Sequence, residues 1–192
     1  MQTCGFPLIA VVLASVLLSL PVSAQQRPEI APESYTGVAL VTGGPAGGAS
    51  MPFDFRITRF TTDEELNNYA ELLKEKGQDA LLSVLEKQDC GRIQPVGSTG
   101  NQIAVARKSQ QGGNTVITIV TARKMSFGEL YNNGRSVDYP FGFLQVNLDA
   151  QGNGTGQFVI AAKLSFNKKE SSYEIESFGN QYVKASNVRP NK

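Results

Sequence analysis

The stretch FDFRITRFTTDEELNNYAELLKEKG, residues 53–77, decides the fold class, because the hydrophobic period changes within it. Phe53, Phe55 and Ile57 alternate with polar residues, which predicts a strand with these three side chains turned inward. From Thr62 onward the apolar residues recur at helical spacing, which predicts a helix. The chain therefore leaves a sheet and enters a helix at this point.

Residue types at both ends of the helical stretch define its limits. Thr62 followed by Glu65 matches a capping box, and Gly77 after a lysine-containing last turn is typical of a helix end. A second helix is predicted from residue 78 to about residue 88. The two helices form a helical hairpin over residues 62–88, with a single kinked helix as the alternative.

Strand patterns occupy the chain on both sides of this helical hairpin. Alternating or β-branched runs and intervening turns predict strands at residues 35–42, 53–57, 103–108, 115–121, 141–148, 157–167, 173–178 and 181–188. The predicted fold class is α+β and mainly antiparallel β, with about eight or nine strands in a curved sheet or a barrel. The helical hairpin is inserted after the second strand.

Two of these strands have a marked face pattern. Glu174 and Glu176 are expected on the solvent face of their strand, with Tyr173 and Ile175 on the face toward the body. A glycosidase pair must flank a sugar, so two acids on one solvent face do not define such a site. In the strand at 157–167, one apolar face is expected to carry Phe158, Ile160, Ala162, Leu164 and Phe166.

The first residues have the composition of a secretory leader. Residues 6–20 form an apolar run, and small residues at Ser23 and Ala24 suit a signal peptidase. We therefore expect a signal peptide at residues 1–24, with an uncleaved anchor as the alternative, and an exported protein in the periplasm or outside the cell. The run is shorter than the ~20 residues of a membrane-spanning helix, so no span is expected after cleavage. After the signal peptide we expect an extended N-terminal segment, the lead, at residues 25–33 and then a single β-rich domain at residues 34–192.

Composition excludes several function classes. The 192 residues include no histidine, which removes the commonest general base and the commonest metal ligand. The net charge of +1, with charged residues at 18%, gives no electrostatic basis for nucleic-acid binding. The glycine-rich run at residues 43–48 precedes a strand instead of a helix, and the loop at Asp149 has a single carboxylate. We expect no cofactor, no metal site and no catalytic constellation.

Cys90 is the only cysteine that remains after removal of the leader. No internal disulfide is then possible, although an intermolecular one is. Its place at the end of a predicted helix disfavours a thiolate, because the helix dipole is negative there. We expect a buried, inert thiol.

The segment at residues 123–140 is the candidate binding loop. Long connections in compact domains are uncommon and often bind ligands, although a short strand at residues 124–130 is an alternative. The side chains expected to contact a ligand are Phe127, Tyr131, Arg135, Asp138 and Tyr139.

Four stretches of the chain are similar to an uncharacterised family of short exported bacterial proteins: residues 61–66 (TTDEEL), 135–142 (RSVDYPFG), 161–167 (AAKLSFN) and 187–189 (NVR). They are spread over most of the part after the leader. The resemblance implies export and a single domain. It assigns no activity, ligand or site residue.

Three functions remain open on these observations. The first is a non-enzymatic binding module for a small apolar ligand, with the segment at 123–140 at the mouth of its pocket. The second is an envelope structural or assembly protein whose strands associate edge to edge. The third is a histidine-independent enzyme, which the lack of a catalytic constellation makes the weakest of the three. The oligomeric state is open in all of them.

Overall fold

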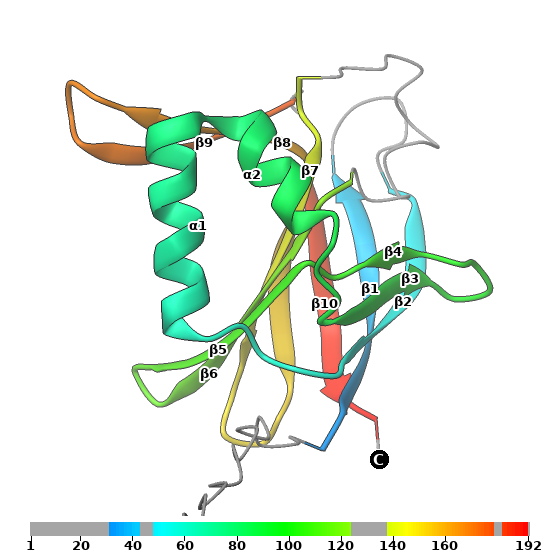
Figure 1. The fold of residues 1–192 in the computed structure, drawn as a ribbon. Coiled ribbons are helices and arrows are strands. Elements are labelled where there is room, and N and C mark those ends of the chain that lie inside the picture. Colours follow the sequence, from blue (N-terminus) through cyan, green and yellow to red (C-terminus); the bar gives the residue numbers. More distant parts are fainter. Residues whose placement is uncertain (1–30, 43–47, 124–137, 179–181, 192) are drawn as a thin grey trace, which may run out of the picture.

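The computed structural model describes residues 31–42, 48–123, 138–178 and 182–191, and shows an antiparallel sheet curled into a half-barrel with two helices beside it (Figure 1). The strands run in the order β4-β3-β2-β1-β10-β8-β7-β6-β5, with β9 paired to β8. Their bounds are β1 (Glu33–Thr42), β2 (Ser50–Ile57), β3 (Gly91–Pro95), β4 (Asn101–Gln102), β5 (Val105–Gln111), β6 (Asn114–Thr121), β7 (Phe141–Leu148), β8 (Gly154–Asn167), β9 (Ser172–Ser177) and β10 (Tyr182–Pro190). The predicted α+β class is confirmed.

Two helices, α1 (Asp63–Lys76) and α2 (Gln78–Leu85), lie between β2 and β3, so the predicted insertion is confirmed. Thr62 caps α1 as its sequence indicates: the Thr62 side chain accepts from the Glu65 amide, and the Glu65 carboxylate accepts from the Thr62 amide. Gly77 separates the helices at a φ of 81°, a backbone conformation that favours glycine.

The concave side of the half-barrel is filled by side chains. Phe53, Phe55 and Ile57 of β2 are buried there, as predicted. The ring of Phe55 stacks on the ring of Tyr35 in β1, with the centroids 4.8 Å apart. Phe53 and Phe158 pack edge to face, with the centroids 5.0 Å apart. The described side chains thus form a packed core inside the curl of the sheet.

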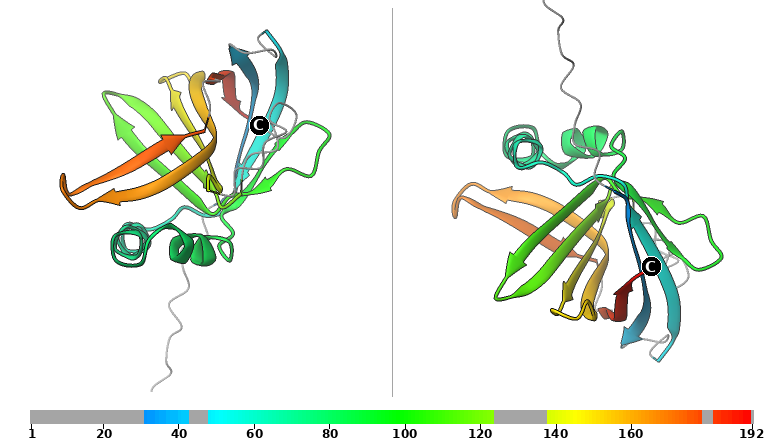
Figure 2. Two further views of the ribbon diagram at one scale, coloured as in Figure 1. Left: turned by 90° about the horizontal axis from the view of Figure 1, so that it is seen from above. Right: turned by 90° about the horizontal axis from the view of Figure 1, so that it is seen from below.

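A second core lies between the helices and the outer face of β5 to β8. The faces of β6 divide accordingly: Ile117 and Ile119 belong to the inner core, whereas Val120 belongs to the core under the helices. Leu73 of α1 and Leu81 of α2 are buried in this second core. Figure 2 shows both helices on the outside of the curled sheet.

Strand β8 does not keep the single apolar face that its sequence predicts. The register with β7 shifts between the pair Phe141 and Ala162 and the pair Phe143 and Val159, which marks a β-bulge. Phe158 therefore belongs to the inner core, whereas Ala162 lies in the core under the helices. Strict alternation fails here because an extra residue reverses the facing of every later side chain.

The expectation that Tyr173 and Ile175 face the body is also wrong. Their side chains are 49% and 58% exposed, respectively. Strand β10 pairs with the first part of β8, residues 154–158. Strand β9 pairs only with the second part of β8, residues 162–167. Both faces of β9 are consequently exposed, including the expected solvent face that carries Glu174 and Glu176.

The predicted leader at 1–24 and all but the last residues of the lead at 25–33 lie outside the described residues. Within the described ranges, neither helix has the length and apolar character to cross a bilayer.

Truncating a central ring of the inner core tests its contribution to stability. Phe55→Ala should lower the free energy of unfolding by about 3–5 kcal/mol, because it removes apolar contact and leaves a cavity. Urea denaturation would measure the loss. Val96→Ala serves as the control, since Val96 is 59% exposed and its truncation should change stability by no more than about 0.5 kcal/mol. Equal effects of the two substitutions would contradict the assignment of the inner core.

Candidate functional site

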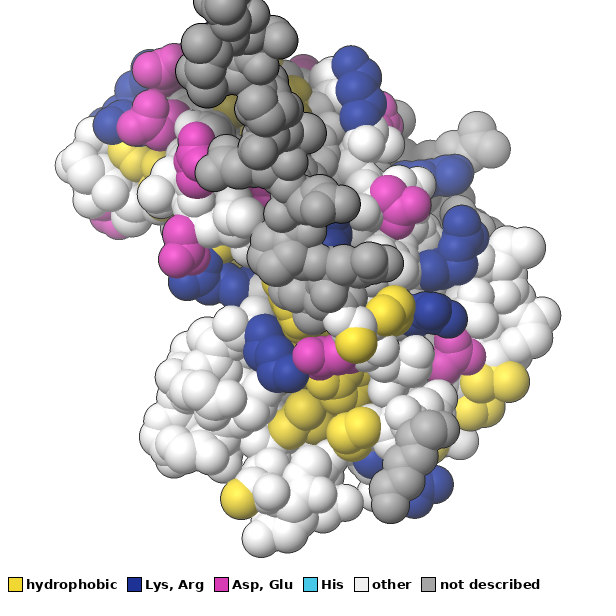
Figure 3. All heavy atoms as spheres, turned by 60° about the horizontal axis from the view of Figure 1, so that its bottom comes forward, with side chains coloured by type: hydrophobic (Ala, Val, Ile, Leu, Met, Phe, Trp, Pro, Cys, Tyr) yellow, Lys and Arg dark blue, Asp and Glu magenta, His cyan; other side chains and the backbone are white. Residues whose placement is uncertain are grey.

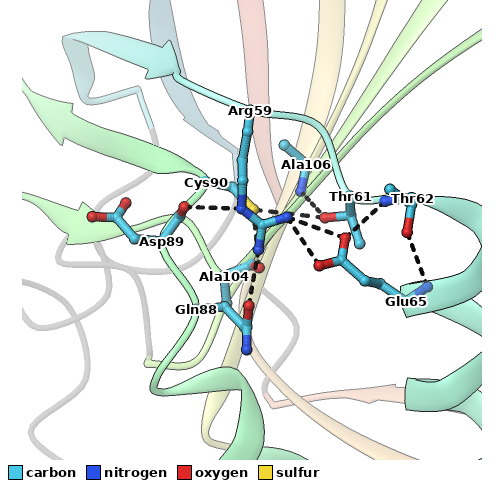
Figure 4. Close-up of polar contacts among 9 residues, drawn as sticks. All are labelled: Arg59, Thr61, Thr62, Glu65, Gln88, Asp89, Cys90, Ala104 and Ala106. Atoms are coloured by element: carbon cyan, nitrogen blue, oxygen red, sulfur yellow. Dashed lines mark hydrogen bonds and ion pairs between the residues drawn. The ribbon is translucent and has the colours of Figure 1, made fainter. Parts of the chain in front are cut away.

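Arg59 joins the linker after β2, the start of α1 and the end of α2 (Figure 4). Its Nη1 lies 3.2 and 3.1 Å from the two carboxylate oxygens of Glu65. Its Nη2 donates to Oε1 of Gln88 at 2.8 Å, and its Nε donates to the carbonyl of Asp89 at 3.3 Å. Since all three nitrogens have partners within the protein, the guanidinium ties the helical hairpin together.

The linker itself is bound to the edge of β5. The Thr61 amide donates to the carbonyl of Ala106 at 2.8 Å, and the Ala106 amide donates to Thr61 Oγ1 at 3.1 Å. Thr61 is buried although it is polar, which these hydrogen bonds explain. The sheet edge that β5 presents is thereby covered at this point.

Replacing Arg59 tests whether this cluster is structural. Arg59→Ala should lower the free energy of unfolding by about 2 kcal/mol, because it removes the paired contact with the partly buried Glu65 carboxylate and the hydrogen bonds to the Gln88 side chain and the Asp89 carbonyl. Chemical denaturation would measure the change. Arg107→Ala is the matched control: its ion pair with Asp63 is largely exposed and should contribute no more than about 0.5 kcal/mol. A larger loss for Arg107 than for Arg59 would overturn this assignment.

Cys90 lies against the same cluster and is fully buried. Its thiol donates to the carbonyl of Ala104 at 3.3 Å, and its Sγ lies 3.7 Å from Thr61 Oγ1. Burial raises the pKa of the Cys90 thiol, and the opposing effects of Thr61 and Arg59 are smaller. The predicted buried thiol is confirmed, and this environment disfavours a nucleophilic thiolate.

The raised pKa gives a pH dependence of stability. The folded state holds the Cys90 proton more tightly than the unfolded chain, so its contribution is complete below the ordinary thiol pKa of about 8.5 and declines above it. Unfolding free energies measured from pH 7 to 10 should therefore fall more steeply for this protein than for Cys90→Ala. A thiol reagent at pH 8 should label Cys90 only when denaturant unfolds the chain. Rapid labelling of the native protein would contradict the buried environment.

A cleft of about 470 Å³ lies beside the cluster, at the end of α2. Its walls come from the end of α2, from β4 and from the residues that flank β5 and β6. The lining residues are Leu85, Glu86, Gln88, Gln102, Ala104, Ala122 and Arg123. This volume falls within the range of small-molecule binding sites.

The cleft combines an apolar surface with polar groups. Leu85, Ala104 and Ala122 contribute the apolar part and are themselves almost fully buried. The Gln102 side chain is fixed by donation of its Nε2 to the carbonyl of Gln88 at 2.6 Å. Because Arg59 holds the Gln88 side chain in turn, the structural cluster also sets the shape of this cleft.

The two flanks of the predicted binding loop both lie beside α2. Arg123 lines the cleft at the end of this helix. At the other end, Gln78 Nε2 donates to the carbonyl of Asp138 at 3.1 Å, while Gln78 Oε1 accepts from the Leu164 amide at 2.8 Å. Residues 124–137 lie outside the described residues, and with them the expected ligand contacts Phe127, Tyr131 and Arg135.

The remaining expected contacts, Asp138 and Tyr139, are described and do not line the cleft. The Asp138 side chain is exposed. The Tyr139 hydroxyl donates to a carboxylate oxygen of Glu176, and its ring lies 5.2 Å from the Phe178 ring. The hydrogen bond to Glu176 raises the pKa of Tyr139. Tyr139 therefore ties the end of the loop to β9.

Other chemistry finds little support in the described parts of the chain. There, no group of three or more acidic or cysteine side chains could hold a metal ion. The carboxylate of Asp149 accepts hydrogen bonds from the backbone amides of Gln151 and Asn153, which stabilises the turn that contains it. The interior side chains of the sheet belong to packed cores, and the acids of β9 are exposed.

Comparison of the chain with known protein families, with curated proteins and with solved structures finds no match in any of the three.

Sequence reasoning did not find the cleft. Its apolar wall consists of one leucine and two alanines from separate segments, which have no common motif or spacing. Only Arg123 belongs to the segment that the sequence marks as a candidate loop. The cleft lies between the end of a helix and the edge of the sheet, so its residues come together only in the folded chain.

Proposed function

We propose that this protein is a non-enzymatic binding module for a small ligand with an apolar body and an acidic group. The cleft of about 470 Å³ between α2 and the flanks of β5 and β6 carries this proposal. Small-molecule sites are typically concave and mostly apolar, with a few placed polar groups. The cleft is concave and carries placed polar groups, and its exposed lining is more polar than apolar. The concave side of the half-barrel, in contrast, is filled by the inner core.

The apolar body of the ligand would contact Leu85, Ala104 and Ala122. Arg123 supplies a guanidinium, which binds carboxylates through paired hydrogen bonds. Glu86 lines the same cleft and disfavours an anion, so these two side chains have opposite effects on an acidic ligand.

Charge supports a small ligand over a nucleic acid. The formal net charge is +1, and on the face shown in Figure 3 acidic side chains lie among the basic ones. A nucleic-acid interface requires basic residues that dominate one face.

We also propose that the protein is exported and acts in the periplasm or outside the cell. The apolar run at residues 6–20 and the small residues at Ser23 and Ala24 support this proposal. Native mass spectrometry of protein purified from its own host should give a mass that begins at Gln25, together with a dissociable small molecule. A mass that includes residues 1–24 would contradict the cleavage.

Decanoate is a suitable probe for the cleft, with decanol as a control that lacks the acidic group. Isothermal titration should show decanoate binding that Arg123→Glu weakens by about tenfold or more and Glu86→Gln strengthens. Arg189→Glu is the matched control for the charge change, because Arg189 is an exposed residue of β10 outside the cleft. Equal affinity of all variants, with unchanged thermal midpoints, would overturn this site.

A further inference from the structure

The second half of β8 and β9 form a two-stranded hairpin that extends past the rest of the sheet. Strand β7 pairs with β8 as far as Ala162, and β9 pairs with β8 from Ala162 to Asn167. Figure 1 shows this hairpin beside α1, and Figure 2 shows it leaving the body of the sheet. Lys74 of α1 lies over the ring of Phe166, with its Nζ 5.5 Å from the ring centroid, so the helix supports the β8 side.

One edge of this hairpin is occupied by the protein itself. The Leu164 amide of β8 donates to the side chain of Gln78 at the start of α2. Leu164 therefore directs its amide away from β9, and its pair with Ile175 is a non-hydrogen-bonded pair of the ladder.

The outer edge of β9 has the opposite arrangement. Because hydrogen-bonded and non-hydrogen-bonded pairs alternate, Tyr173 and Ile175 point their backbone amides and carbonyls away from β8. No other strand in the described ranges pairs with this side of β9. An edge with outward amides and carbonyls is a template for strand addition.

The side chains of β9 define what could pair with it. Tyr173 and Ile175 lie on the same face as Leu164 and Phe166, beyond the part that the helices cover, and are 49% and 58% exposed. Glu174 and Glu176 lie on the opposite face, also exposed. The edge thus presents an apolar face and an acidic face.

The neighbours of Glu174 and Glu176 on β8 do not carry enough positive charge to balance both carboxylates. Glu174 lies opposite Ser165 of β8 and accepts a hydrogen bond from the Asn167 side chain at 2.7 Å. Glu176 lies opposite Lys163 of β8 and accepts the Tyr139 hydroxyl. Only one basic residue therefore stands opposite the two acids.

We propose that β9 binds an extended segment of another protein by strand addition, in which apolar residues alternate with basic ones. The apolar residues would lie beside Tyr173 and Ile175, and the basic ones opposite Glu174 and Glu176. This interaction goes beyond the proposed ligand cleft and uses a different surface.

The charges disfavour a second copy of this chain as the occupant. Antiparallel self-pairing centred on Ile175 places Glu174 opposite Glu176 of the other copy, twice. Centring the pair on Glu174 places two copies of this acid opposite each other. Like charges directly opposite one another destabilise a strand pair.

A synthetic peptide in which valine alternates with lysine tests the proposal, with a matched valine–glutamate peptide as the control. The lysine peptide should bind the purified protein and slow amide hydrogen exchange in residues 172–177. The glutamate peptide should bind about tenfold more weakly or not at all. The double variant Glu174→Lys, Glu176→Lys should reverse this preference.

Ile175→Pro tests the backbone part of the interaction. Proline removes the outward amide at this position but no hydrogen bond to β8, so the hairpin is retained while strand addition is blocked. Its thermal midpoint and decanoate binding should match those of the parent, and peptide binding should be lost. Equal binding of both peptides, unchanged binding by Ile175→Pro, or self-association of the protein through β9 would overturn the proposal.

Discussion

The helical hairpin can be inserted into the sheet because its two ends meet. The chain leaves β2 and returns to β3 at neighbouring points, where the Thr58 amide donates to the Cys90 carbonyl at 2.9 Å. The Cys90 amide in turn donates to Ile103, and Arg59 holds the residues on both sides of the junction. This closure fixes where the helical hairpin leaves and rejoins the sheet, and α1 and α2 then pack the outer core. Burial of the uncharged thiol at its centre is consistent with a role in packing.

The same closure places the candidate site. The end of α2 is fixed by Arg59 through Gln88, and Gln88 fixes Gln102. One wall of the cleft therefore belongs to the helical hairpin and the other to the sheet. A site between two elements that are held by a common polar cluster keeps its shape without a ligand, which lowers the entropic cost of binding.

The sequence was sufficient for features that depend on local chemistry. The capping box at Thr62, the glycine break at Gly77 and the inward side chains of β2 follow from residue type and period alone. The sequence did not predict features that depend on contacts between distant segments of the chain. The exposure of Ile175 depends on how far the helices reach over the hairpin, and the bulge in β8 depends on pairing with β7. The cleft was missed because its residues meet only through the closure at Cys90.

The bulge in β8 makes this strand part of both cores. Before the bulge, Phe158 completes the packing inside the curl; after it, Ala162 and Leu164 pack under the helices. A strand without the bulge would turn one of these two sets toward the wrong side. The length of β8 therefore matters more than its composition. Exchanges among apolar residues keep both cores, whereas the gain or loss of one residue between Val159 and Ala162 would turn either Phe158 or Ala162 out of its core.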